Sequence, residues 1–184
     1  MKSYKLVVLT LFLVLVSVTA FPGISAKAAI NNKPGDIIIT NSTSSSGIVG
    51  HSGIYITDTT ILHTSGWKSE PYPTVLTESQ WHSRYEKSKV VRSSSSTLGK
   101  NAANKAIYYF KGKKITYKIT SGPTNIASTY CSELVWYSYY KAGKTFKTRN
   151  SSGSFYQPTS PTPYNFIDKF NVSHNGFTFI DNSW

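Results

Sequence analysis

A hairpin that carries two histidines most constrains the fold of this chain. Residues 51–56 ("HSGIYI") and 60–65 ("TILHTS") each have the composition of a short strand, and "TDT" between them is a tight hairpin turn. Side chains alternate between the two faces of a sheet, and residues 51 and 63 are separated by an even number. The pattern therefore predicts an antiparallel pair of strands with His51 and His63 on the same face.

The rest of the chain predicts further strands, followed by helices and a closing strand. Turn residues such as Pro34 and Gly35 separate the segments, and Thr77 and a serine near residue 95 are suited to cap helices. This order favours one α+β domain with an antiparallel sheet. The predicted elements are strands at 36–40, 51–56, 60–65, 89–93, 114–122 and 176–180, helices at 77–87, 95–112, 128–143 and 164–170, and irregular segments at 66–77 and 151–163.

The clearest helix is residues 128–143, "STYCSELVWYSYYKAG". Ser128 or Thr129 can cap its start, and Gly143 is suited to end it. Cys131 then lies one or two residues inside the N-terminus. Apolar residues at helical spacing predict a face turned to the core; these are Leu134, Val135, Tyr139 and Ala142.

Cys131 is the single cysteine of the chain, so it has no disulfide partner within the chain. Unpaired N–H groups and the positive end of the helix dipole stabilise a thiolate at a helix start, which lowers the thiol pKa. The same N–H groups can bind the oxyanion of a tetrahedral intermediate. A buried packing role is the alternative, but the helix-start position favours a nucleophile.

A thiol nucleophile needs a base, and the base needs an orienting partner. His51 can supply the base, and His63 can hold its ring in the reactive tautomer. Two structural histidines are the alternative interpretation. A zinc site made from these two residues and Cys131 lacks the usual short ligand spacings, so neither a metal nor another cofactor is predicted.

Four motifs together resemble the circularly permuted NlpC-type cysteine peptidases, the YiiX/YaeF-like group. They are "GDIII", "GHSGIYI", "ILHTS" and, far downstream, "YCSELVWYSY". The histidine strand precedes the cysteine helix, which is the permuted order of that group and also of lecithin retinol acyltransferase and its phospholipase relatives. The resemblance implies a permuted papain-like fold, with an antiparallel sheet packed against helices and the cysteine at a helix N-terminus.

The resemblance also implies roles for four residues. Cys131 is expected to be the nucleophile, His51 the general base, His63 the orienting residue and Tyr130 part of the oxyanion or substrate site. Some members of the group carry a glutamate where this chain has His63. The "NCEHF" sequence of the acyltransferase branch is replaced by "YCSEL", which favours the peptidase/amidase branch.

The first 28 residues predict export. Lys2 and Lys5 precede the apolar run "LVVLTLFLVLVSV", and small residues follow, as in a secretory signal peptide. Cleavage is expected after Ala28, with Ala20 as the alternative, which leaves 29–184 as a single catalytic domain that is secreted, extracellular or associated with the cell wall.

The charge of the mature chain indicates which kinds of molecule it is expected to bind. The formal net charge is +12, and without Lys2, Lys5 and Lys27 the mature chain carries +9. This excess favours anionic wall polymers or a membrane surface. Nucleic acid is not predicted, because no zinc-finger spacing or RNA-binding signature is present.

Three functions remain open at this point. The first is an exported thiol hydrolase that cleaves an amide bond through a Cys-His-His acyl-enzyme mechanism, with peptide or peptidoglycan-like material as the substrate. The second is a thiol acyltransferase or lipase acting on lipid at a membrane surface. The third is a non-catalytic surface-binding protein on the same scaffold, against which the presence of all three catalytic positions argues.

Overall fold

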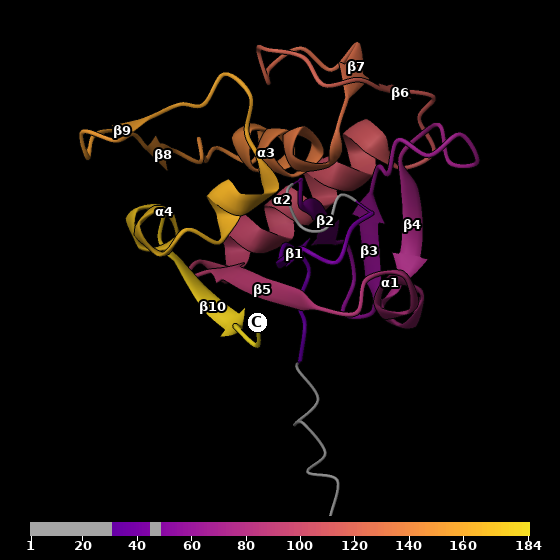
Figure 1. Ribbon diagram of the computed structural model, residues 1–184, viewed down its shortest axis with the longest axis horizontal. Coiled ribbons are helices and arrows are strands. Elements are labelled where there is room, and N and C mark those ends of the chain that lie inside the picture. The colour runs from indigo at the N-terminus through magenta and orange to yellow at the C-terminus, as the bar shows by residue number, and fades with distance from the viewer. Residues whose placement is uncertain (1–30, 45–48) are drawn as a thin grey trace, which may run out of the picture.

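A six-stranded antiparallel sheet organises the protein (Figure 1). The computed structural model describes residues 31–44 and 49–184, so the predicted signal peptide lies outside the described residues. The strand order in the sheet is β10-β5-β1-β2-β3-β4. These strands are β1 (Ile37–Thr40), β2 (His51–Tyr55), β3 (Thr60–His63), β4 (Thr74–Thr77), β5 (Ser88–Ser93) and β10 (Phe177–Asp181).

Helices and two small ribbons complete the domain. In Figure 1, α2 and α3 lie together on the sheet, while α1 lies beside β3 and β4. The helices are α1 (Glu78–Arg84), α2 (Ser96–Phe110), α3 (Cys131–Lys141), the 3-10 turn η1 (Pro163–Phe166) and α4 (Lys169–His174). The parallel ribbon pairs β6 (Thr116–Tyr117) with β7 (Ser128–Thr129), and the antiparallel ribbon pairs β8 (Thr148–Arg149) with β9 (Phe155–Tyr156).

Both faces of the central strands are buried. On one face, Ile37 and Ile39 of β1 pack in a large core with apolar residues of α2 and α3. On the other face, Ile38 packs in a smaller core with Trp81 of α1. Because side chains alternate along a strand, the run "IIIT" supplies both cores, and the sheet holds α1 on the side opposite α2 and α3.

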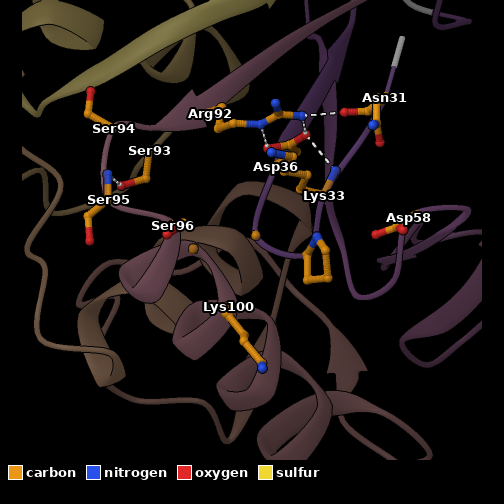
Figure 2. Close-up of a pocket in the computed structure, with 13 residues that line it drawn as sticks. Asn31, Lys33, Asp36, Asp58, Arg92, Ser93, Ser94, Ser95, Ser96 and Lys100 are labelled. Carbon is orange, nitrogen blue, oxygen red and sulfur yellow. Dashed lines mark hydrogen bonds and ion pairs between the residues drawn. The ribbon is translucent and has the colours of Figure 1, made fainter. Parts of the chain in front are cut away.

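The start of β1 is tied to the end of β5 by a nearly buried ion pair. Arg92 donates from Nε and from one terminal nitrogen to Asp36, at 2.7 and 2.6 Å, and that nitrogen also donates to the Asn31 carbonyl oxygen. The Lys33 backbone N–H donates to the same carboxylate at 2.9 Å. These groups line a cavity of about 570 Å³ beside the start of α2 (Figure 2). The cavity lies at the end of β1 and β2 away from His51, because Ile37 pairs with Ile54 and Thr40 with His51.

Most predicted elements are confirmed, including the hairpin and all three longer helices. Thr77 caps α1 in a full capping box, Ser95 caps α2, and Gly143 follows α3 with a φ of +95°. The predicted α+β class with an antiparallel sheet is therefore confirmed. Among the described residues, no helix combines the length and the apolar character that crossing a bilayer requires.

Four local predictions are wrong. Within the segment predicted to be irregular at 151–163, Phe155 and Tyr156 pair with β8 as β9. Residues 74–77, expected to be irregular, form β4 because they pair with β3 along its whole length. Of the strand predicted at 114–122, only the two residues of β6 pair. The helix predicted at 164–170 is split, because the Asp168 side chain accepts hydrogen bonds from two backbone N–H groups and starts α4 anew.

The start of α3 also differs from the prediction. Ser128 and Thr129 pair with β6 as β7, so neither caps the helix. Tyr130 is the N-cap residue and supplies no side-chain hydrogen bond. Cys131 is consequently the first residue of the helix.

A substitution at Gly35 can test how closely α2 approaches the start of β1. Its φ is +95°, and a Cβ there would overlap the Gly99 carbonyl of α2; its own carbonyl accepts the Tyr139 hydroxyl at 2.5 Å. We expect Gly35→Ala to lower the free energy of unfolding by about 3 kcal/mol, from the left-handed backbone and the overpacking together. Gly112→Ala is the matched control, because Gly112 has φ +71° but open space around it, and should cost only about 1 kcal/mol. Urea unfolding measures both, and equal losses would contradict the close packing.

Candidate active site

His51 and His63 meet on one face of the sheet, as the sequence predicts. His51 begins β2 and His63 ends β3, and the register pairs Ile54 with Leu62. The His51 Nε2 and His63 Nδ1 atoms are 2.9 Å apart. Both side chains are buried, so this hydrogen bond is shielded from water.

The hydrogen bond fixes which nitrogen of His51 can act as a base. Nε2 of His51 is occupied by this bond, so Nδ1 is the nitrogen that can face a thiol. In the tautomer that leaves the lone pair on Nδ1, Nε2–H of His51 donates to Nδ1 of His63. His63 then carries its proton on Nε2, a buried atom that has no hydrogen-bond partner in the described part of the chain. Burial lowers the pKa of His51 well below its usual value, with His63 adding to the effect, and burial lowers the pKa of His63 to about 3. Both rings are therefore neutral near pH 7.

Aromatic residues from α1 and its C-terminal cap hold the His51 ring. Trp81 stacks on it with ring centroids 5.4 Å apart and planes 19° apart, and Tyr85 lies 5.2 Å away. Trp81 is itself fixed by a 2.9 Å hydrogen bond from its indole nitrogen to the Ser88 hydroxyl. These contacts leave the His51 ring little freedom to rotate.

Cys131 lies at the start of α3, which packs against β2. Cys131 and His51 line the same cavity of about 520 Å³. Because Tyr130 provides no side-chain cap, the first N–H groups of the helix remain available to an anion. The structure therefore brings together the three residues that the sequence singled out for catalysis.

The expected depression of the thiol pKa is wrong in direction. Burial raises the pKa of Cys131, while hydrogen bonds from Ser52 and Ser132 lower it by less. The thiol is only 4% exposed, so the loss of water around a thiolate outweighs the helix terminus. The Cys131 thiol and the His51 imidazole are consequently both neutral near pH 7.

Tyr117 of β6 is a site residue that the sequence analysis missed. Its hydroxyl forms a hydrogen bond with the Cys131 side chain, and burial together with Cys131 raises the pKa of Tyr117. The hydroxyl therefore stays protonated at neutral pH and can donate. No local signal marks Tyr117, because it reaches the thiol through a two-residue ribbon whose pairing is not visible in the sequence.

Tyr130 is buried and lines a second, mainly apolar cavity of about 220 Å³, which Ile119 and Pro161 also line. This position agrees with the substrate part of the expected role, and the oxyanion part stays a prediction. Cys131 also lines this cavity, as do Gly50 and Tyr117. Cys131 thus lies between two cavities. One is the cavity that it shares with His51, called the polar cavity below, and the other is this apolar cavity.

An ion pair borders the polar cavity. Arg84 lines the cavity, and one of its terminal nitrogens lies 2.7 Å from a carboxylate oxygen of Glu70, which is not itself a lining residue. The Arg84 guanidinium holds the pKa of Glu70 below its usual value. In the part of the chain that the structure describes, no three histidine, cysteine, aspartate or glutamate residues lie together as metal ligands.

Comparisons with known proteins agree with this geometry. Residues 1–175 match a family described as "Lipoprotein N-acylation protein LnsA-like". An uncharacterised 30.3 kDa protein of Bacillus thuringiensis is 34% identical over 155 residues; the match covers 77% of this chain and 54% of the relative, so the chain spans about half the length of that protein.

A solved structure is similar over most of both chains. The crystal structure of a protein from Escherichia coli O157:H7, titled "metalloprotein yiiX", superposes with a TM-score of 0.60 at 19% identity and covers 84% of this chain and 99% of that chain. This likeness concerns the fold, and it confirms both the predicted papain-like fold and the predicted YiiX-like group.

The resting state of the thiol gives a direct prediction. Because burial disfavours the charged form, the pKa of Cys131 should exceed 9.0, its ordinary value. The thiolate absorbance at 240 nm, taken as the difference between the protein and Cys131→Ser across a pH titration, should therefore be absent at pH 7 and appear above pH 9. A difference signal already present at pH 7 would mean that the helix terminus outweighs burial.

Proposed function

Because the chain belongs to the LnsA-like lipoprotein N-acylation family, we propose that it is a thiol-dependent acyl-transfer enzyme with Cys131 as its nucleophile. The observation that carries the proposal is the position of Cys131. It shares one cavity with His51 and opens onto a second, apolar cavity. A reactive thiol beside an apolar cavity suits an acyl group held against the sulfur.

The first half-reaction forms a thioester. As the thiol of Cys131 attacks the carbonyl carbon of an acyl ester, His51 takes the S–H proton on Nδ1. The Nε2–H of the resulting imidazolium donates to His63. The tetrahedral intermediate then expels the alcohol, which receives the proton from His51, and the acyl group stays on sulfur.

The second half-reaction releases the acyl group. An amine or a water molecule attacks the thioester, His51 takes a proton from it, and the thiol leaves with that proton restored. Attack by an amine gives an amide, and attack by water gives a free acid. In both halves the oxyanion forms beside the open N–H groups of α3 and the Tyr117 hydroxyl, which can donate to it.

The apolar cavity favours an aliphatic acyl donor. Ile119, Tyr130 and Pro161 line it, and apolar surface of this kind stabilises a hydrocarbon chain by removing it from water. The family description agrees with acyl transfer to an amine.

Hydrolysis of an amide bond in cell-wall peptide is the second candidate function. It uses the same acyl-enzyme, and Arg84, which lines the polar cavity and is paired with Glu70, gives a peptide a polar contact. Export through the segment at 1–28 and action outside the cytoplasm form part of both proposals.

Product analysis separates these functions. The full chain is incubated with a phospholipid carrying a labelled acyl chain, with and without a lipopeptide that has a free N-terminal amine, and separately with purified peptidoglycan. We expect labelled thioester on Cys131 and, with the lipopeptide, labelled amide, both detected by mass spectrometry. New peptide termini from peptidoglycan with no acylation would favour the amidase, and no product in any mixture would contradict both.

Variants of the three residues test their roles. Cys131→Ala should abolish turnover, and His51→Ala should lower kcat/KM by about 10³-fold, since both proton transfers are lost. His63→Ala removes only the positioning of the ring, so we expect a smaller loss of about 10- to 100-fold. His63→Asn should restore part of it, because its amide oxygen can accept the His51 hydrogen bond.

The rescue distinguishes positioning from packing. Circular dichroism confirms that each variant is folded, and kcat/KM is measured on one soluble thioester substrate. If His63→Ala is as inactive as His51→Ala and Asn does not rescue it, the roles of base and orienting residue are wrongly assigned. Full activity in His63→Ala would make His63 a structural residue.

A further inference from the structure

Three exposed apolar side chains surround the opening above Cys131. Val49 is 56% exposed, Trp67 46% and Ile119 62%. Val49 lines both cavities at the thiol, Trp67 lines the polar cavity and Ile119 lines the apolar one. Residues from three separate segments of the chain therefore form one apolar rim, defined here as Val49, Trp67 and Ile119.

Two of the segments that carry this rim are held together. The loop between β3 and β4 contains Gly66, and a Cβ on Gly66 would touch the Tyr117 ring of β6. Figure 1 shows that this loop and β6 lie at the same end of the molecule, above the start of α3. The segments that carry Trp67 and Ile119 are therefore packed against each other beside the site.

Positive charge accompanies the rim. Lys68 follows Trp67, and Lys118 lies between Tyr117 and Ile119; both lysines are exposed. Lys113 and Lys114, also exposed, lie shortly before β6, separated from it by Ile115. No carboxylate occurs in the sequence between Glu86 and Glu133. The segment 87–132, which includes Lys113, Lys114 and Lys118, therefore carries positive charge alone.

We propose that this apolar rim and its lysines dock the enzyme on an anionic lipid bilayer, with Cys131 facing the membrane. The inference rests on the proposed function, for which it names the source of the acyl donor. Apolar side chains that insert at the level of the headgroups and lysines that contact anionic lipids are the two contributions that bind a protein at a membrane surface. A lipid leaving the bilayer here passes the rim directly into the apolar cavity beside the thiol.

The depth of Trp67 in the bilayer is the primary test. The full-length Cys131→Ala variant, which leaves lipids intact, is mixed with phosphatidylglycerol-rich vesicles whose acyl chains are brominated. Bromine quenches only tryptophans that enter the acyl region, so we expect quenching that is largely lost in a Trp67→Phe background. Because this signal reports Trp67 itself, the apolar stretch in residues 1–28 cannot produce it by holding the protein to the vesicle.

Rim substitutions test the contacts. Ile119→Ser should weaken the apparent affinity for vesicles, measured by quenching of Trp67, about tenfold, because an apolar anchor is removed. The matched control is Phe170→Ser, because Phe170 is 50% exposed on α4, away from the cavities at Cys131; it should leave the affinity unchanged. Equal losses in both variants would overturn the proposal.

Charge reversal tests the lysines. The double variant Lys113→Glu, Lys114→Glu should weaken vesicle binding by at least about tenfold and lower turnover of vesicle-borne lipid, with turnover of a soluble thioester unchanged. The control reverses Lys33 and Lys100, which line the cavity at the far end of β1 (Figure 2), and should have little effect. Similar losses in both pairs would mean diffuse attraction without a docking surface and would overturn the proposal.

The remaining outcomes separate docking from catalysis. Absence of quenching with normal turnover of the soluble thioester would overturn the docking surface and leave the proposed function standing. Quenching of Trp67 in Cys131→Ala, together with no turnover by the protein that keeps Cys131, would support docking and count against the proposed function. Burial of Trp67 in a dimer, seen as a doubled mass in solution with no quenching by vesicles, would assign the rim to a second copy of the chain.

Discussion

The burial of two hydrogen-bonded histidines between the sheet and α1 is the constraint on which the site depends. His51 and His63 share one hydrogen bond in a space closed by Trp81, and burial keeps both rings neutral. A neutral His51 with its lone pair on Nδ1 is the form that can accept a proton. Had the pair been exposed to water, His51 would be partly protonated near pH 6.5, its ordinary pKa, and a fraction of the molecules would lack a base.

The same burial disfavours a charged thiolate, so the groups around Cys131 must stabilise the negative charge that the proposed reaction creates. A thiol without water around it resists ionisation, so in the proposed reaction the sulfur and the His51 ring become charged only when substrate is attacked. At that moment the N–H groups at the start of α3 and the Tyr117 hydroxyl are already in place, and they need no reorganisation. Their electrostatic effect is larger in a site that excludes water than at an open surface. A high resting pKa of Cys131 is therefore compatible with rapid acyl transfer, provided that His51 is the base.

Local pattern was sufficient to predict that His51, His63 and Cys131 lie together and insufficient to predict their environment. The even spacing of His51 and His63 across a short turn placed them on one face, and the helix signal around Cys131 placed the thiol at a helix start. Tyr117 and Trp81 were not predicted as site residues because each reaches the site through tertiary packing, Tyr117 from a two-residue ribbon and Trp81 from α1, which packs on the face of the sheet that carries the two histidines. The thiol pKa was predicted in the wrong direction for a related reason. Helix position can be read from sequence, whereas burial depends on everything that packs around the sulfur.

The position of Cys131 between the polar and the apolar cavity allows the two half-reactions of the proposed reaction to follow one another at the same sulfur. One sulfur can hold one acyl group, so the amine cannot react until the alcohol of the donor has left. An acyl chain retained in the apolar cavity leaves the polar cavity free, and the departing alcohol and the incoming amine can use that cavity in turn. His51 lines this polar cavity, where it can give a proton to the first and take one from the second. A single base and a single thiol therefore serve both halves of the exchange without any movement of the sheet or of α3.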